Sequence, residues 1–226
     1  MKYEQFSNLS CYEEFEIQCT LNGISKIDAL KEIGHKIDNY YFFVSDDGIF
    51  NWFDLEGNHV KDPGILKILK EEHIPLSISK CIIPDSVISI CTDTFLGCYL
   101  LKEIIIPNSV ENIGEWAFCA CKSLTSITIP NSITYISHEV FKQCTSLKEV
   151  FISNSVTSIG VFAFLGCKSL EKIVIPDNVT NIRYEAFCNC KSLKEIIFKG
   201  KTLDEVKRME DYPFGIKDTS IIKCEI

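Results

Sequence analysis

The 226-residue sequence has no long hydrophobic run and no recognisable export signal. Its longest apolar stretches, such as Tyr40–Val44, fall far short of the roughly 18 residues needed to cross a bilayer. The first residues, Met1–Phe6, do not place a basic segment before an apolar one, as a secretory signal would. We therefore expect no membrane insertion. The predicted location is the cytoplasm, or a place reached by an export route that needs no signal peptide.

Glycine, proline and positive charge are also in short supply. Eleven glycines and seven prolines are too few for a collagen-like or low-complexity chain. The balance of 23 Lys and Arg against 31 Asp and Glu gives a net charge of −8, and no Lys/Arg run is present. This balance argues against nucleic acid as a partner. The 46% of hydrophobic residues instead indicates a globular protein with a sizeable core.

Common catalytic motifs are absent as well. No G-x-x-x-x-G-K-[ST], G-x-G-x-x-G, G-x-S-x-G or H-E-x-x-H pattern occurs. We therefore predict that the protein is not an enzyme and needs no cofactor. The enzymatic alternative would require a cleft beside the N-terminal region that brings His35, His59 or His73 near a cysteine; the remaining histidine, His138, is in no recognisable motif.

The sequence does contain an internal repeat of 23 residues. Three residue types recur without a gap through five consecutive units, and a fourth column of prolines is interrupted once, by Ser153. The uninterrupted columns are Phe95, Phe118, Phe141, Phe164 and Phe187; Cys98, Cys121, Cys144, Cys167 and Cys190; and Leu101, Leu124, Leu147, Leu170 and Leu193. The proline column is Pro84, Pro107, Pro130 and Pro176.

Each repeat is predicted to form one coil of a solenoid. The L-x-x-L-x-L spacing of Leu124, Ile127 and Ile129 is typical of a short strand whose alternate side chains enter a core. We expect a second extended piece at 133–136 and a helical or 3₁₀ turn at 137–146. One coil cannot bury these side chains alone, but stacked coils can, because each column then becomes a continuous apolar ladder. Five coils over 84–198 would rise roughly 24 Å.

The cysteines are predicted to be free thiols that act as small buried hydrophobes. Two C-x-C pairs, in which Cys119 and Cys188 lie outside the column two residues before Cys121 and Cys190, lack the histidines or C-x-x-C partners of a zinc site. Thiols that stack in adjacent coils also point the same way, which is poor geometry for a disulfide. We therefore expect no metal centre.

The repeat resembles a known family. Two segments of the chain, Ile106–Ile127 and Ile175–Ile196, match the pattern I-P-x-S-V-T-x-I-x-x-x-A-F-x-x-C-x-x-L-x-x-I. This pattern is the signature of the BspA-like leucine-rich repeats, which the repeat therefore resembles. Departures occur at Ser153, Thr94 and Val140. The resemblance implies an α/β-type solenoid, a right-handed coil with a parallel sheet on one face. It further implies a protein that binds other proteins, commonly at cell surfaces, and that rarely has catalytic activity.

The flanks of the repeats are expected to close the ends of the stack. Residues 1–61 are predicted to form an α+β module, either an extended cap or a separate recognition or tethering unit. Its helix is marked by Ile24, Ile27, Leu30, Ile33 and Ile37, and its hairpin by Tyr40–Val44 and Ile49–Asp54 around an Asp-Gly turn.

A solenoid is predicted over 62–198, with a helical cap at 62–83 before the five repeats of 84–198. In that cap Asp62 and Pro63 signal the start of a helix that ends near Glu72. At 199–226 we expect a C-terminal cap. There, a capping box at 202–205 opens a short helix that places Leu203, Val206 and Met209 over the last coil, and a strand follows at 220–224.

One column between buried strand positions is predicted to face outward and to bind a partner. Its members are Ile82, Ile105, Thr128, Phe151, Val174 and Ile197, with Glu149 and Lys172 among the charged residues beside them. An aligned apolar stripe on an exposed sheet face is a candidate contact surface, and Phe151 is its best anchor. The alternative is that β-branched residues simply favour strands, or that flanking side chains cover the stripe.

The function predicted from the sequence is a non-enzymatic protein-binding module that presents this sheet face to a partner. Adhesion or a host or cell-surface interaction would be one setting for it. A glycan is the alternative ligand. The alternative function is structural, as a component of a larger assembly that is anchored by the N-terminal module.

Overall fold

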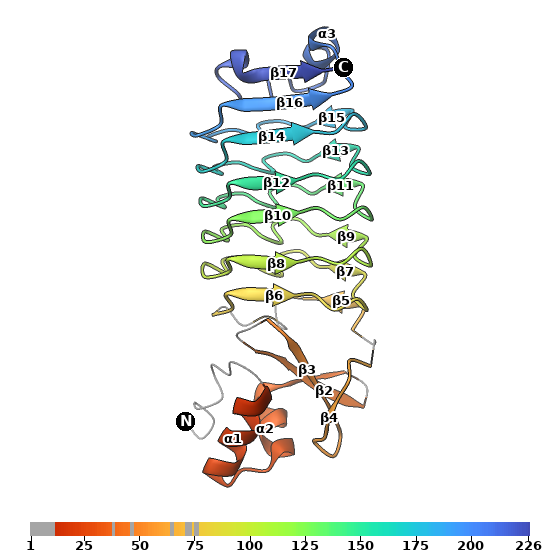
Figure 1. Cartoon of the computed structure of the whole chain (residues 1–226), viewed down its shortest axis with the longest axis vertical. Coiled ribbons are helices and arrows are strands. Elements are labelled where there is room, and N and C mark those ends of the chain that lie inside the picture. Colours follow the sequence, from red (N-terminus) through yellow and green to blue (C-terminus); the bar gives the residue numbers. More distant parts are fainter. Residues whose placement is uncertain (1–11, 38, 46–47, 64–65, 71–73, 75–76) are drawn as a thin grey trace.

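The computed structural model describes residues 12–37, 39–45, 48–63, 66–70, 74 and 77–226. The chain forms an elongated stack of coils with a small α+β module at one end, and its C-terminus lies at the opposite end (Figure 1). Within the described residues, no helix has the length and apolar character needed to span a bilayer.

The N-terminal module packs two helices against an antiparallel sheet. The helices are α1 (Tyr12–Asn22) and α2 (Lys26–Ile33), and the strands, in sheet order, are β1 (His35–Ile37), β2 (Tyr40–Val44), β3 (Phe50–Asp54) and β4 (His59–Val60). The predicted hairpin is confirmed as β2 and β3. The predicted helix is shorter than expected, because it ends at Ile33 and Ile37 belongs to β1. Helix α1 was not predicted.

The β2–β3 hairpin contributes side chains to two cores, because successive residues of a strand point to opposite faces. One face packs against the module's own helices. Its buried residues are Tyr41, Phe43 and Phe53, which cluster with Phe15, Cys19, Ala29 and Leu30. The other face joins the core of the solenoid through Phe42, Val44, Phe50 and Trp52. The module therefore covers the apolar end of the first coil.

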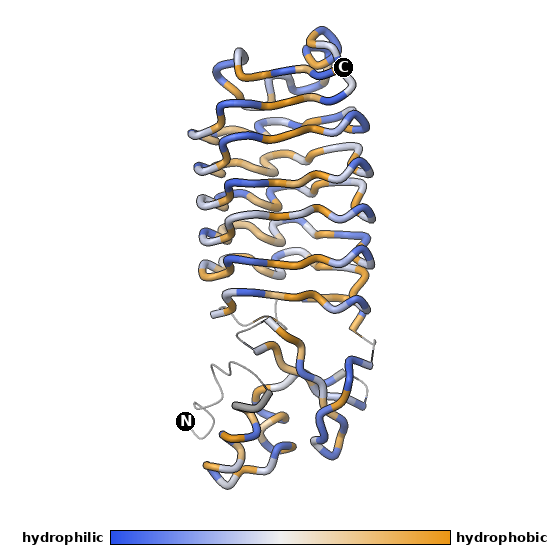
Figure 2. The backbone as a smooth tube through the Cα atoms, in the orientation of Figure 1, coloured by the Kyte–Doolittle hydropathy of each residue, from blue (hydrophilic) through white to orange (hydrophobic). Residues whose placement is uncertain are grey.

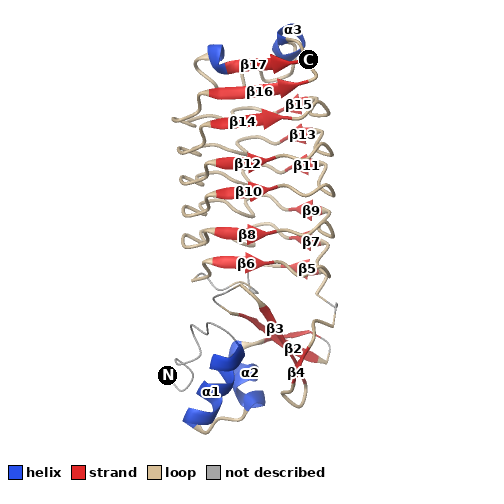
Figure 3. Ribbon diagram, viewed as in Figure 1, coloured by secondary structure: helices blue, strands red, loops and turns tan. Residues whose placement is uncertain are grey.

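The coils place two rows of short parallel strands on opposite sides of the stack (Figure 3). The front row consists of β6 (Lys80–Ile82), β8 (Glu103–Ile105), β10 (Ser126–Thr128), β12 (Glu149–Phe151), β14 (Lys172–Ile175) and β16 (Glu195–Lys199). The back row consists of β5 (Ile68–Leu69), β7 (Ser89–Ile90), β9 (Asn112–Ile113), β11 (Tyr135–Ile136), β13 (Ser158–Ile159) and β15 (Asn181–Ile182). Paired strands follow the period of the sequence, so that Ile127 lies opposite Val150 and Ile136 opposite Ile159.

One expectation about local structure is wrong, and another is met only in part. The segment 137–146 forms consecutive turns and no helix, and Glu139 and Gln143 have positive φ angles of 53° and 60°. Two of these turns are closed by bonds of the 3₁₀ type, from the Lys142 N–H to Glu139 O and from the Cys144 N–H to Phe141 O. The helix expected from Asp62 to Glu72 is contradicted where the structure describes it, because Ile68–Leu69 form β5 and pair in parallel with β7. Residues 64–65 and 71–72 of that prediction lie outside the described residues.

The interior of the stack consists of ladders of like side chains. Consecutive rings of the phenylalanine column stack with centroid separations of 5.0, 5.6, 5.4 and 5.5 Å from Phe95 to Phe187. All five rings are 2% exposed or less. Hydrophobic stretches recur at the same places in successive coils (Figure 2). The predicted stacking of equivalent residues is thus confirmed.

The C-terminal segment covers the last coil. Thr202 and Glu205 form the predicted capping box at the start of α3 (Leu203–Lys207). Val206 is buried, and Met209 packs against the core. Leu203, in contrast, is 42% exposed and does not take the predicted place. A 3₁₀ turn, η3 (Thr219–Ile221), then leads into β17 (Ile222–Glu225), which pairs in parallel with β16.

Candidate functional site

The predicted contact column lies on the front row of strands, and most of it is exposed. Phe151 is 55% exposed, Ile105 46% and Val174 36%, and Thr128 is also exposed. Ile82, on the first front strand, is only half-buried. The front face therefore presents an exposed column in which Ile105, Phe151 and Val174 are apolar and Thr128 is polar.

Ile197 does not belong to the exposed stripe, and the prediction that it faces solvent is wrong. Its side chain is only 5% exposed. It lies on β16, which is hydrogen-bonded to a strand on each side, so that Val174 and Lys223 are its register neighbours on the same face. Neighbours on both sides shield its side chain, which the column position alone does not reveal.

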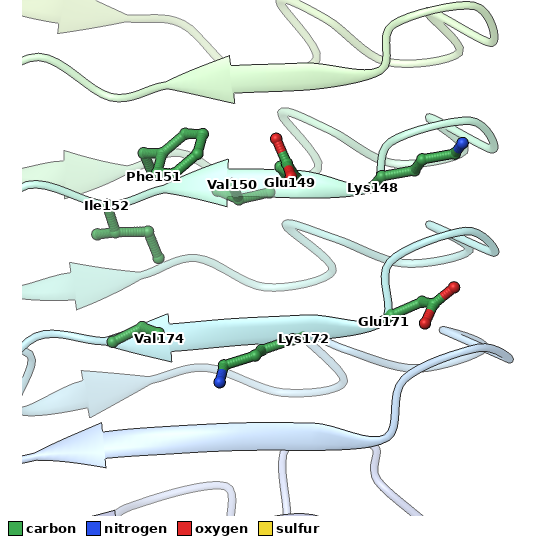
Figure 4. Close-up of a pocket in the computed structure, with 8 residues that line it drawn as sticks. All are labelled: Lys148, Glu149, Val150, Phe151, Ile152, Glu171, Lys172 and Val174. Carbon is green, nitrogen blue, oxygen red and sulfur yellow. The ribbon is translucent and has the colours of Figure 1, made fainter.

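A groove opens on the front face between β12 and β14. It has a volume of about 560 Å³ and is lined by Lys148, Glu149, Val150, Phe151, Ile152, Glu171, Lys172 and Val174. Figure 4 shows Glu149 and Phe151 on one strand, with Lys172 and Val174 on the next. The structure thus brings together four of the predicted site residues, whereas Ile82, Ile105, Thr128 and Ile197 do not line this groove.

A second concavity lies at the carboxyl ends of the central front strands. It has a volume of about 420 Å³ and shares Phe151 and Ile152 with the first groove. Thr128 and the turn residues Asn108 and Asn131 also line it. Phe151 therefore stands between two hollows. The repeat period does not identify Ile152 as a site residue, because it places this residue in an inward column, whereas the side chain is only half-buried.

Charged side chains surround the groove, and they differ in whether they are paired. Lys172 forms an ion pair with Glu195 at 2.9 Å, and Glu171 forms one with Lys194 at 2.8 Å. The hydrogen bond from Lys194 lowers the pKa of Glu171 below its ordinary value. Lys148 and Glu149, on the other side of the groove, form no ion pair shorter than 4 Å with the described residues, but the charge of Lys148 also contributes to the lowered pKa of Glu171.

The cysteine column is a packing element. Four of its five thiols donate to the main-chain oxygen of a phenylalanine in the preceding coil, for example from Cys144 Sγ to Phe118 O at 3.1 Å and from Cys167 Sγ to Phe141 O at 3.2 Å. Burial raises the pKa of both thiols well above the ordinary value, and that of Cys190 to about 12. The described cysteines are free, as predicted. Thiols held in this protonated form are poor nucleophiles and poor metal ligands.

The histidines do not converge on a cysteine in the part of the chain that the structure describes. The centroids of the His35 and Phe42 rings lie 5.2 Å apart, and those of the His59 and Phe53 rings lie 5.5 Å apart. His138 lies in the stack, where its Nδ1 accepts a hydrogen bond from the Val161 N–H at 2.9 Å. His73 lies outside the described residues. No group of three His, Cys, Asp or Glu among the described residues is arranged to hold a metal ion.

Comparisons with known proteins agree with this architecture. Solved structures similar to the chain include a leucine-rich repeat protein of T. pallidum, with 31% identity over 53% of this chain and 58% of that one, and a TM-score of 0.51. A leucine-rich cell surface protein of Faecalibacterium prausnitzii is 25% identical over 74% of this chain and 54% of its own, with a TM-score of 0.48. A leucine-rich repeat protein of Bacteroides ovatus is 27% identical over 73% and 49%, with a TM-score of 0.49.

The chain thus spans about half the length of these proteins. The comparison with curated proteins gives no match. The model of the BspA type leucine rich repeat region matches six copies over residues 72–214, which is more than half of the chain. Repeats of this kind generally form protein-interaction modules. The chain therefore belongs to the family of BspA-type leucine-rich repeat proteins.

Proposed function

We propose that the front face of the solenoid binds a protein partner, with Phe151 as the central contact. The observation that carries the proposal is the position of Phe151, which is 55% exposed and stands between two hollows of about 560 and 420 Å³. Large aromatic side chains that anchor an interface contribute most when pockets around them can exclude water. The proposed surface is centred on Phe151 and Val174, with Glu149 and Lys172 at its rim.

Packing does not explain why an aromatic ring stands at this position. Thr128 occupies the equivalent place one coil earlier, and Val174 one coil later, in the same strand register. A polar or small side chain is therefore compatible with the fold here. A ring left largely in water contributes little to folding but can bury its area against a partner.

The test is affinity capture from the native source, followed by mass spectrometry, with the wild-type chain and two variants. Phe151→Asp should lose the captured partner, while its stability falls by less than about 1 kcal/mol because the site is exposed. Leu100→Asp is the matched control, since Leu100 is also 55% exposed but lines neither hollow. Equal capture by Phe151→Asp and the wild-type chain would show that the surface is not the binding site.

The same experiment addresses the structural alternative, attachment to a larger assembly through the N-terminal module. That alternative is supported by two exposed side chains on α1, Ile17 at 56% and Leu21 at 74%. Deletion of the module is a poor test, because it would uncover Phe42 and Trp52 at the end of the stack. The double substitution Ile17→Asp and Leu21→Asp leaves that contact in place. Loss of capture in this variant alone would favour attachment over front-face binding.

Adhesion at a cell surface stays a prediction. It concerns where the partner resides, and the chemistry of the front face does not depend on it. A glycan is the competing ligand, and a glycan array probed with the wild-type chain and with Phe151→Asp tests it.

A further inference from the structure

A strip of side chains runs along the turns that follow the back row of strands, outside the front face. Trp116 is 36% exposed, Tyr184 is 53% exposed, and Phe162 between them is half-buried. Trp116 and Phe162 occupy the same place in the repeat, two coils apart, and Glu139 fills that place in the coil between them. None of these residues lines either hollow of the front face. We call them, together with Lys142, the aromatic strip.

Direct contacts join the members of the aromatic strip. The indole N–H of Trp116 donates a hydrogen bond to the Glu139 carboxylate, which also forms an ion pair with Lys142. The Lys142 ammonium lies 6.0 Å from the centre of the Phe162 ring, and that ring meets Tyr184 edge-on at a centroid distance of 5.7 Å. The rings are therefore held in place before a ligand arrives, which reduces the ordering that binding requires.

The fold alone does not explain aromatic residues at this place in the repeat. The backbone there has a positive φ in five successive coils, with values of 54° at Trp116 and 55° at Phe162. Glycine, asparagine and aspartate tolerate this conformation, whereas a bulky side chain is strained in it. Asp93, with a φ of 62°, is the residue at this place in the first of these coils. Contact with a ligand would account for the two strained aromatic residues.

The spacing along the stack selects the kind of ligand. In the interior, ring centroids of successive coils lie 5.6 and 5.4 Å apart, from Phe118 through Phe141 to Phe164. Trp116 and Phe162 are two such steps apart. In a flat β-1,4-linked sugar chain, each sugar advances by nearly the length of one coil, and every second sugar presents the same face. Two alternate sugars can therefore contact Trp116 and Phe162 while the chain lies along the stack.

A polypeptide fits the aromatic strip less well. An extended peptide presents the same face every second residue, which is roughly 7 Å and matches neither one coil nor two. An α-helix has a pitch of about 5.4 Å, close to one coil, but its apolar face would cover the ion pair of Glu139 and Lys142 in the middle coil. Sugar hydroxyls, in contrast, can form hydrogen bonds with both partners of that pair.

The charges near the rings favour a neutral sugar over an acidic one. Glu139 and Lys142 compensate each other. Glu115 and Glu185 add two further carboxylates beside the rings, and Glu185 accepts a hydrogen bond from the Tyr184 phenol. Carboxylates accept hydrogen bonds from sugar hydroxyls, whereas they repel a sugar that carries a carboxylate or a sulfate.

We propose that the aromatic strip binds a neutral, flat β-1,4-linked glycan that lies along the axis of the stack. Alternate sugars pack on Trp116 and Phe162, because the C–H groups on one face of a sugar ring are slightly positive and the face of an aromatic ring is negative. The sugar between them donates a hydroxyl to Glu139, and a fourth sugar reaches Tyr184. This site goes beyond the proposed function, since it lies outside the front face and takes a different ligand.

The probe is a panel of β-1,4-linked tetrasaccharides of glucose, mannose and N-acetylglucosamine. Tryptophan fluorescence reports binding, because Trp116 is the exposed one of the chain's two tryptophans and Trp52 is only 1% exposed. At least one tetrasaccharide should change the emission and bind at least roughly tenfold more tightly than its own disaccharide, which cannot span two coils. Maltotetraose is the matched control ligand and should not bind, because its α-1,4 links coil the chain.

Variants then connect binding to the aromatic strip, with affinity measured by calorimetry. Trp116→Asn and Phe162→Asn should each weaken binding by at least roughly tenfold, and both should fold, because asparagine suits a positive φ. Trp116→Phe keeps a ring and should retain most of the affinity. Tyr99→Asn is the matched control, since Tyr99 is 54% exposed but lies outside the strip, with Lys122 over its ring at 4.7 Å.

Three results would overturn the inference: no response to any tetrasaccharide, equal binding of maltotetraose, or full binding by both Trp116→Asn and Phe162→Asn. If no sugar bound and Trp116→Asn lost a captured protein, the strip would be a protein interface instead. Phe151→Asp should bind the glycan as the wild-type chain does. The proposed function and this inference can therefore fail separately.

Discussion

Phe141 and Phe151 lie in the same coil, one in the interior of the stack and the other on its front surface. Phe141 is 1% exposed, and its ring lies 5.6 and 5.4 Å from those of Phe118 and Phe164. Phe151 is 55% exposed, and the neighbours in its column are Thr128 and Val174. The interior column is uniform because each ring is packed by the same ring of the next coil. The front column varies because the stack places no such demand on it.

The largest loss of stability is expected from a substitution in the interior of the stack. Phe141→Ala should lower the free energy of unfolding by about 3–5 kcal/mol, because it leaves a cavity between two stacked rings. Urea unfolding followed by circular dichroism measures the loss. Phe151→Ala is the matched control and should cost far less, since that ring is mostly in water already. Equal losses in the two variants would break the distinction between interior and front.

A smaller loss of stability is expected from a substitution in the cysteine column. Cys144→Ala removes a buried sulfur and the donor to Phe118 O, and should cost about 1–3 kcal/mol. The control, Cys188→Ala, changes a half-buried thiol outside the column. Denaturant titration of the two variants compares them directly. If Cys188→Ala were the more destabilising, the column would not be the packing element described above.

The smallest change in stability is expected from a substitution on the front face away from the groove. Ile105→Thr should change stability by no more than about 0.5 kcal/mol, because threonine is a good strand former and Ile105 is 46% exposed. Calorimetry is sufficient to detect a larger change. A loss comparable with that of Cys144→Ala would show that the front column is packed after all, and would weaken its assignment as a free surface.

The sequence was sufficient to predict the repeats, because strict periodicity is also what stacking requires. The phenylalanine and cysteine columns, the front strands and the capping box at Thr202 all followed from spacing and local chemistry. The back strand of the first coil was missed for a reason of the same kind. Its strand β5 pairs Leu69 with Ile90, an offset of 21 residues, so that it falls outside the register of 23.

The candidate site was only partly predictable. The period placed Phe151 and Val174 on one face, but it gave the same place to Ile197, which β14 and β17 flank on both sides. The missing sheet pairing between β12 and β14 leaves no mark on the spacing, because Val150 and Ile173 are still one period apart. Backbone pairing between coils depends on how the coils sit on each other, and a single repeat does not encode it.

The N-terminal module could also be predicted only in part from the sequence. Its hairpin was predicted from two largely apolar runs around an Asp-Gly turn, whereas α1 has no strong amphipathic pattern and was missed. The division of hairpin side chains between two cores emerges only once both partners are in place, with Phe53 toward the helices and Trp52 toward the stack.

The central claim is that residues one period apart touch. It can be tested most directly by nuclear Overhauser spectroscopy on a chain with labelled phenylalanine rings. The structure predicts contacts from the ring of Phe141 to those of both Phe118 and Phe164, and none from the ring of Phe141 to that of Phe151. Absence of the first two contacts, or their replacement by contacts between residues close in sequence, would contradict the stacked coils and every surface built on them.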